Sequence, residues 1–172
     1  DAATLTGLTT TSTDEISITM AGASTAASDL NTIDGKTATA ITATAITELT
    51  GNASDVKTAL ASSGITTVTD GSLSVTVSAA STAASDLNAI DSDNAIGTIT
   101  ATAITELTGN ASDVKTALAS SDIVTVTDGS LSVTVSGSTS VADINTINSD
   151  SATGVVTVAA TEQDAATLTG LT

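Results

Sequence analysis

Two regular patterns of apolar and polar residues alternate along this chain. In LSVTVS, the apolar side chains of Leu73, Val75 and Val77 alternate with Ser74 and Thr76. A period of two built from β-branched residues predicts a strand with one buried face. The same alternation returns in ISITM at Ile16–Met20, ITAT at 41–44, TITAT at 98–102 and LSVTVS at 131–136. We therefore predict several short strands whose Ser and Thr side chains face outward.

The second pattern has helical spacing. The segment NASDVKTALA places its apolar residues at i, i+3, i+6 and i+7, which is typical of one helix face. It opens on Asn52, a favourable N-cap, and Asp55 follows at the third position after it, where negative charge suits the helix dipole. We predict helices from about Asn52 to Ala61 and from about Asn110 to Ala119, with shorter ones in the SDLNTI and SDLNAI segments.

The patterns recur because the sequence is internally repeated. Segment 41–78 returns at 99–136, an offset of 58, with two differences: Gly64 becomes Asp122 and Thr66 becomes Val124. STAASDLNTID at 24–34 returns as STAASDLNAID at 81–91, and a looser copy, STSVADINTIN, begins at residue 138. The opening DAATLTGLT returns at 164–172, an offset of 163. We read residues 1–172 as one continuous fragment of a longer array, with 58-residue double repeats inside a 163-residue super-repeat.

Each 58-residue repeat holds two strand–helix halves. The aspartates of the five central halves are separated by 26, 31, 27 and 30 positions, a mean step near 29; they are Asp29, Asp55, Asp86, Asp113 and Asp143. A unit of this size cannot bury its apolar face alone, so neighbouring units stack. The predicted fold is an α/β right-handed repeat solenoid, with a parallel sheet on one face and short helices on the other. An all-β solenoid is the alternative, because Thr and Val are weak helix formers.

Composition limits the chemistry. The chain has no Phe, Tyr, Trp, Cys, Pro or His, and its net charge is −16, from 19 acidic residues against Lys36, Lys57 and Lys115. Such acidity opposes binding to nucleic acid, which requires a basic surface. No apolar run reaches the roughly 18 residues of a membrane span, so we expect no membrane insertion. Without His or Cys to activate a nucleophile, we expect no enzymatic activity.

The motifs ASDLNxID and ITELTGNASDVKTALASSGI resemble the Ala/Thr-rich, leucine-rich-repeat-like tandem arrays of very large secreted bacterial surface proteins, including cyanobacterial ones. The resemblance implies an extracellular or cell-surface location and a structural or adhesive role, and it supplies no catalytic residues. We therefore predict a structural segment of an extended extracellular fibre, surface coat or matrix protein. The alternative is an adhesin stalk, or a repetitive surface whose outward threonines bind ice or a glycan. Expected partners are further copies stacked end to end, neighbouring repeats of the same chain, and surface polysaccharide.

Calcium is the one ligand that the acidic loops suggest. Oxygen-bearing side chains gather at Asp91, Asp93 and Asn94 and, one repeat on, at Asn148 and Asp150. Calcium takes 6–8 oxygen ligands, so such loops can contribute to a site, although neither loop follows a known calcium-binding motif. We predict no other cofactor. A separate expectation concerns the recurring Asn31, Asn88 and Asn145, which we predict to be structural, to point inward and to bond main-chain groups of loops.

Overall fold

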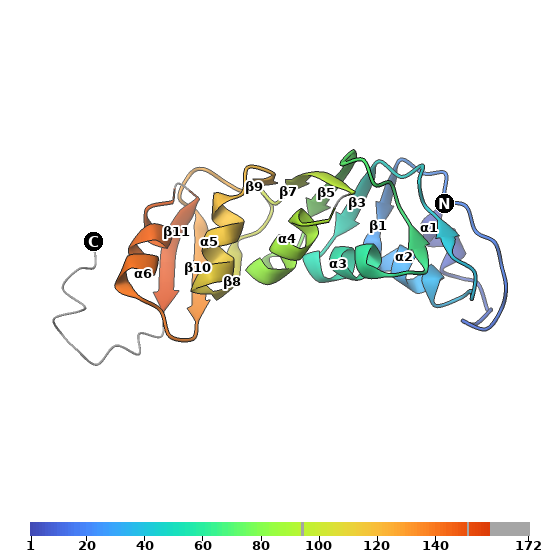
Figure 1. Cartoon of the computed structure of the whole chain (residues 1–172), viewed down its shortest axis with the longest axis horizontal. Coiled ribbons are helices and arrows are strands. Elements are labelled where there is room, and N and C mark those ends of the chain that lie inside the picture. The colour runs from blue at the N-terminus through green and yellow to red at the C-terminus, as the bar shows by residue number, and fades with distance from the viewer. Residues whose placement is uncertain (94, 151, 159–172) are drawn as a thin grey trace.

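The computed structural model describes residues 1–93, 95–150 and 152–158. The chain is a mixed α/β structure with parallel sheets, and it is elongated, with its helices following one another along its length in chain order (Figure 1). The second copy of DAATLTGLT, at residues 164–172, lies outside the described residues.

The helices pack in a row. The described residues form six: α1 (Ala2–Leu5), α2 (Ala27–Asp34), α3 (Ala53–Ala61), α4 (Ala84–Asp91), α5 (Ala111–Ala119) and α6 (Val141–Asn148). Each of them contacts the next one along the chain. The all-β alternative is therefore wrong, because the Ala-rich segments that begin near a cap residue form helices in place of strands.

The strands are short, and every pairing among the described ones is parallel. Those of the first half are β1 (Ser24–Ala26), β2 (Ile41–Thr42), β3 (Glu48–Gly51), β4 (Ile65–Thr66), β5 (Leu73–Val77) and β6 (Ser81–Ala83). Those of the second half are β7 (Ile96–Thr100), β8 (Glu106–Asn110), β9 (Ile123–Val124), β10 (Leu131–Ser136) and β11 (Thr153–Val158). In sheet order they run β1-β3-β5-β7-β9, β11-β10-β8-β6 and β2-β4.

We predicted one parallel sheet. This prediction is wrong, because the described strands form three sheets. The segment from β5 to β6 explains the division. β5 pairs with β3 and β7, whereas β6, which follows β5 closely in the sequence, pairs with β8. One extended segment thus supplies strands to two sheets, and β4 is left to pair with β2.

The alternating burial of the strands is confirmed. Leu73, Val75 and Val77 are at most 1% exposed, while Ser74 and Thr76 between them are partly exposed. The second copy, β10, shows the same pattern. In ISITM, Ile18 and Met20 are buried and Thr19 is exposed, but the segment forms only one isolated parallel bridge, from Thr19 to Thr42. Its predicted strand is therefore reduced to a single bridge at the N-terminal end of the molecule.

The core is continuous and contains no aromatic side chain. Its largest fully buried side chains are Leu30, Ile33, Ile41, Ile46, Leu49, Leu73, Leu87, Ile90, Ile99, Leu107, Leu131 and Ile147. Inward strand positions stack in register; Leu49 of β3, for instance, lies beside Val75 of β5. Each aliphatic side chain that is buried in this way contributes about 1.5–3 kcal/mol, and that contribution depends on the presence of the neighbouring strand.

The predicted helices and their caps are confirmed in α3 and α5. The side-chain oxygen of Asn52 accepts a hydrogen bond from the main-chain N–H of Asp55 at 2.8 Å, and Asn110 does the same for Asp113 at 2.9 Å. The carboxylate of Asp55 in turn accepts a bond from the Asn52 amide at 2.6 Å. By contrast, α2 and α4 begin at alanine and have no side-chain cap.

Replacing Asn52 with alanine is expected to lower the free energy of unfolding by about 0.5–2 kcal/mol, because one N–H of the first turn loses its acceptor. Asn52→Ser is the matched control and should retain most of the stability, since a serine oxygen also caps well. Urea denaturation followed by circular dichroism measures both. Equal losses from the two variants would contradict a capping role.

Candidate functional site

Two kinds of polar contact link neighbouring helices, and they alternate along the row from α2 to α6. The amide of Asn31 in α2 donates to the main-chain oxygen of Asp55 in α3 at 3.0 Å, and Asn88 in α4 repeats this bond to Asp113 in α5. From α3 to α4 and from α5 to α6 the contact is an ion pair instead, Lys57 with Asp86 and Lys115 with Asp143. Asn31 and Asn88 thus bond main-chain groups as predicted, but the prediction that these groups belong to loops is wrong, because each acceptor lies in the next helix.

The ion pairs between helices were not predicted from the sequence. The signal was present, because Lys57 and Lys115 occupy the same place in the two DVK segments of the 58-residue repeat. The ammonium of Lys115, followed by the hydroxyl of Ser140, holds the pKa of Asp143 below its ordinary value. Both pairs are partly exposed, so they fix the spacing of the helices more than they stabilise the fold.

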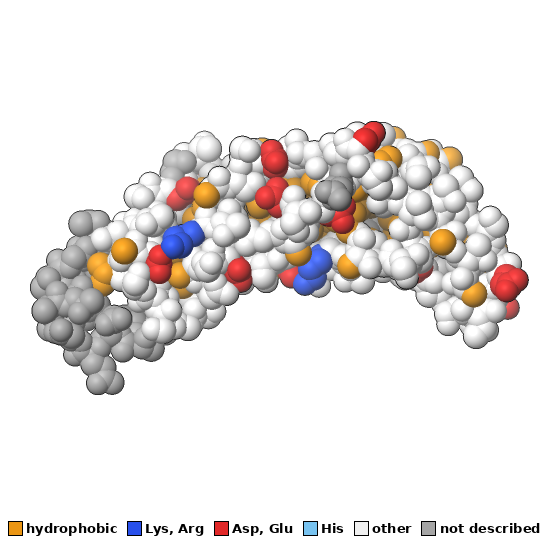
Figure 2. All heavy atoms as spheres, in the orientation of Figure 1, with side chains coloured by type: hydrophobic (Ala, Val, Ile, Leu, Met, Phe, Trp, Pro, Cys, Tyr) orange, Lys and Arg blue, Asp and Glu red, His pale blue; other side chains and the backbone are white. Residues whose placement is uncertain are grey.

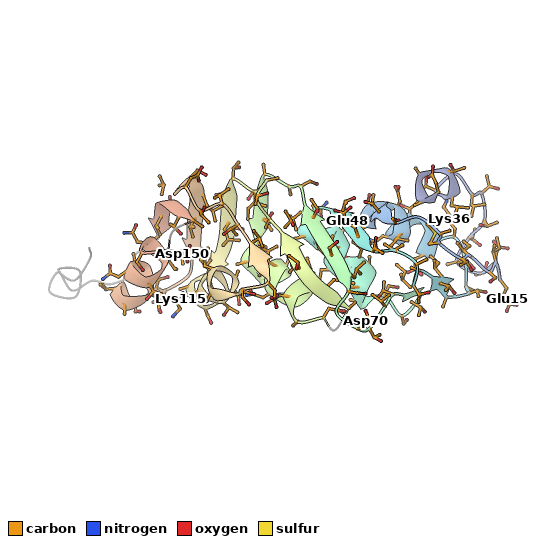
Figure 3. The ribbon with its side chains drawn as sticks, turned by 90° about the horizontal axis from the view of Figure 1, so that it is seen from above. Glu15, Lys36, Glu48, Asp70, Lys115 and Asp150 are labelled. Atoms are coloured by element: carbon orange, nitrogen blue, oxygen red, sulfur yellow. The ribbon has the colours of Figure 1, made fainter. Side chains whose placement is uncertain are left out.

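Outward Ser and Thr side chains stand in rows across the sheets, as the alternation predicts. One row runs from Thr50 through Thr76 to Thr100 on neighbouring strands. The rows have acidic neighbours, because Glu48 accepts a hydrogen bond from the Thr76 hydroxyl at 2.7 Å and Glu106 accepts one from Thr134 at 2.9 Å. Figure 3 labels Glu48 within the sheet region.

These hydrogen bonds affect the two glutamates. The hydroxyls of Ser24 and then Thr76 lower the pKa of Glu48 below its ordinary value, and Ser81 and Thr134 lower the pKa of Glu106. The carboxylates therefore stay ionised to lower pH than a free glutamate would. As a result, the threonine rows carry fixed negative charge and some of their hydroxyls already have partners.

Two of the candidate calcium ligands, Asp93 and Asp150, lie just after helices, whereas Asp91 is the last residue of α4. The Asp93 carboxylate accepts a bond from the main-chain N–H of Ala95 at 2.8 Å, and Asp150 accepts one from Ala152 at 2.9 Å. Asn148 is the last residue of α6 and also makes a polar interaction, and Asn94 lies outside the described residues. Within residues 1–93, 95–150 and 152–158, no three acidic side chains gather closely enough to hold a metal ion.

Asp91 is the least satisfied of these carboxylates. One oxygen accepts a hydrogen bond from the Ser120 hydroxyl at 3.0 Å, and the other is buried without a partner among the described residues. In the first copy, Asp34 and Ser62 make the same bond at 2.7 Å, and Gly64 lies against the Asp34 carboxylate. The counterpart of Gly64 is Asp122, so the second copy adds an acidic residue at this place.

Millimolar calcium is expected to raise the midpoint of thermal unfolding by relieving repulsion around Asp91 and Asp93. Asp122→Gly restores the residue of the first copy and is expected to reduce that increase, because one of the charges is removed. Melting curves of both proteins, with sodium chloride at matched ionic strength as the control, measure the effect. An unchanged midpoint in calcium would contradict the prediction.

Several small hollows open on the surface of the described part. One of about 470 Å³ lies between α2 and α3, and its lining comprises Asn31, Asp34, Lys57, Thr58, Ala61 and Ser62. Figure 2 shows that this face of the molecule has scattered acidic side chains and few lysines. The ammonium of Lys57 is paired with Asp86. The lining contains no His or Cys that could activate the hydroxyls of Thr58 and Ser62.

Comparison with known proteins gives no relative. No protein-family model, no curated protein and no solved structure matches this chain. No helix of the described part is long and apolar enough to cross a membrane.

Proposed function

We propose that this chain is a segment of a right-handed α/β solenoid, with a strand–helix repeat near 29 positions, that serves as a structural element of an extended extracellular fibre, surface coat or matrix protein. The observation that carries the proposal is the row of helices, in which each helix packs against the next one along the chain. Strand pairing supports the stacking, because every described register joins partners 22 to 26 positions apart, although this step is shorter than the repeat near 29. A molecule built in this way becomes longer as units are added.

The charge of the chain suits such a role. A net charge of −16 over 172 residues keeps neighbouring molecules apart at low ionic strength and allows closer approach when salt screens it. The two lysine–aspartate pairs lie between helices, where they hold successive units in line. We expect no enzymatic activity, since the chain contains neither His nor Cys.

The alternative of an ice- or glycan-binding surface has less support. The threonine rows are in register, which favours binding to a repetitive ligand. However, the hydroxyls of Thr76 and Thr134 already donate hydrogen bonds to Glu48 and Glu106. The chain also has no aromatic residue on which a sugar ring could stack. These observations favour the structural role.

Two measurements test the proposal. Small-angle X-ray scattering should give a radius of gyration clearly above the roughly 16 Å expected for a compact domain of this length. Immunogold electron microscopy of the source cells should place the protein on extended material outside the cell. Compact particles in solution, or label confined to the cell interior, would overturn the proposal.

A further inference from the structure

Two Asp–Gly pairs occupy exposed turns, one in each copy of the 58-residue repeat. Asp70-Gly71 precedes β5, and Asp128-Gly129 precedes β10. Both aspartates are exposed and lie outside the helices and strands, and Figure 3 labels Asp70 at the margin of the molecule. An Asp–Gly pair is open to one spontaneous reaction of aspartate, because glycine has no side chain to hinder attack by its own main-chain nitrogen.

This reaction proceeds within the chain and needs only water. The main-chain nitrogen of Gly71 loses its proton and attacks Cγ of Asp70, which closes a succinimide ring and expels one carboxyl oxygen as water. A second water then opens the ring at either carbonyl. One product is aspartate again, and the other is isoaspartate, in which the main chain runs through Cβ and is one carbon longer. A protonated carboxyl reacts faster than a carboxylate, because its hydroxyl can leave as water.

In each turn, the serine two residues after the aspartate holds its carboxylate. Oδ1 of Asp70 accepts hydrogen bonds from the main-chain N–H of Ser72, at 3.1 Å, and from the Ser72 hydroxyl. Oδ1 of Asp128 accepts a bond from the N–H of Ser130 at 3.1 Å. The serine hydroxyls, followed by the N–H groups, hold the pKa of both aspartates below its ordinary value, which favours the less reactive carboxylate. The same bonds direct each carboxylate toward its serine.

The turns also contact the following strand, which leaves no room for a longer main chain. The main-chain oxygen of Gly71 lies against Gly97 of β7, where even a Cβ atom would clash, and Gly129 makes the same contact with Gly154 of β11. An extra carbon before Gly71 would displace this oxygen toward β7. The packing of the turn therefore opposes isoaspartate, while the serine opposes closure of the ring.

A third Asp–Gly pair, Asp34-Gly35, has a different setting. Asp34 is the last residue of α2, and the N–H of Gly35 donates to the main-chain oxygen of Asn31 at 3.3 Å. The Asp34 carboxylate accepts a hydrogen bond from the Ser62 hydroxyl, just after α3, at 2.7 Å. The nitrogen and the carboxyl group thus have separate partners, so this pair is expected to stay unmodified in the folded protein.

We propose that Asp70 and Asp128 are sites of spontaneous isomerisation to isoaspartate, and that Ser72 and Ser130 are positioning residues that slow it. The wild-type protein accumulates isoaspartate slowly at these two sites and not at Asp34. Each serine acts on its own turn alone, because its hydrogen bonds are local. This chemistry does not depend on the proposed structural role of the chain.

Peptide mapping of the full chain after long incubation near neutral pH tests the proposal. Digestion with a protease that cleaves before aspartate but not before isoaspartate, followed by mass spectrometry, measures each site separately. Ser72→Ala should increase isoaspartate at Asp70 several-fold and leave Asp128 unchanged, whereas Ser130→Ala should do the reverse. Ser72→Thr keeps a hydroxyl group and should restore the slow rate at Asp70.

The pH profile separates this role from a simple loosening of the turn. The rate should fall as the pH rises through the pKa of Asp70, and in Ser72→Ala this fall should lie at higher pH, because the carboxylate has lost a donor. Circular dichroism verifies folding, and the wild-type chain in urea is the unfolded reference, in which all three sites should react faster. An unchanged rate at Asp70 in Ser72→Ala, an unshifted pH profile, or isomerisation at Asp34 as fast as at Asp70 in the folded protein would overturn the inference.

Discussion

Replacing Leu107 with alanine is expected to lower the free energy of unfolding by about 2–5 kcal/mol. Leu107 is fully buried on β8, where it lies in register between Thr82 of β6 and Val133 of β10. Its removal leaves a cavity between three neighbouring strands, and the chain has no aromatic residue that could move to fill it. Guanidinium denaturation followed by circular dichroism measures the loss.

Hydrogen exchange tests where in the molecule the loss of stability is located. In a stacked structure, protection should fall most strongly in β6, β8 and β10 and less in the distant β1. Leu49→Ala, in the first copy, should shift the largest loss to β1, β3 and β5, because Leu49 lies between Thr25 and Val75. Val124→Ala is the exposed control and should change stability by no more than about 0.5 kcal/mol. A uniform loss of protection over the whole chain would contradict this picture.

Replacing Gly97 with alanine is expected to cost about 3 kcal/mol, at the upper end of the usual cost of overpacking. A Cβ atom at Gly97 would clash with the main-chain oxygen of Gly71, which has φ +71° in the turn before β5. The added atom would meet main chain, so a change of rotamer cannot relieve the clash. The register of β5 and β7 also shifts at this place, between Leu73 and Ser74.

The second copy offers an independent test of the same contact. A Cβ atom at Gly154 would clash with the oxygen of Gly129, so Gly154→Ala should have a similar cost. Gly22→Ala is the control, because its nearest neighbouring atom would be at 3.7 Å, and it should be neutral or slightly stabilising. Thermal unfolding of all three variants compares them. If Gly97→Ala were as stable as Gly22→Ala, the close approach of the two strands would not be required.

Local features of the fold were predictable because neighbouring residues determine them. Asn52 caps α3 as the sequence indicates, since the cap and the N–H that it satisfies lie within one turn of each other. The inward positions of β5 follow from strict alternation, because a shift of one residue would expose every apolar side chain. The sequence identified Asp93 and Asp150 as candidate calcium ligands. It did not show that their carboxylates accept hydrogen bonds from main-chain N–H groups, because these bonds depend on the conformation of the chain after each helix.

The tertiary structure alone decided how the units are joined. The sequence by itself determined helices at the capped Ala-rich segments and the buried faces of β5 and β10. It did not determine that β5 and β6 serve two sheets, that Lys57 reaches Asp86 on the next helix, or that Gly97 meets Gly71. The first of these features divides one extended segment between two sheets. The other two join parts of the chain that are distant in sequence. The physical reason is that local propensity fixes which element forms, while the packing of neighbouring units fixes its partners.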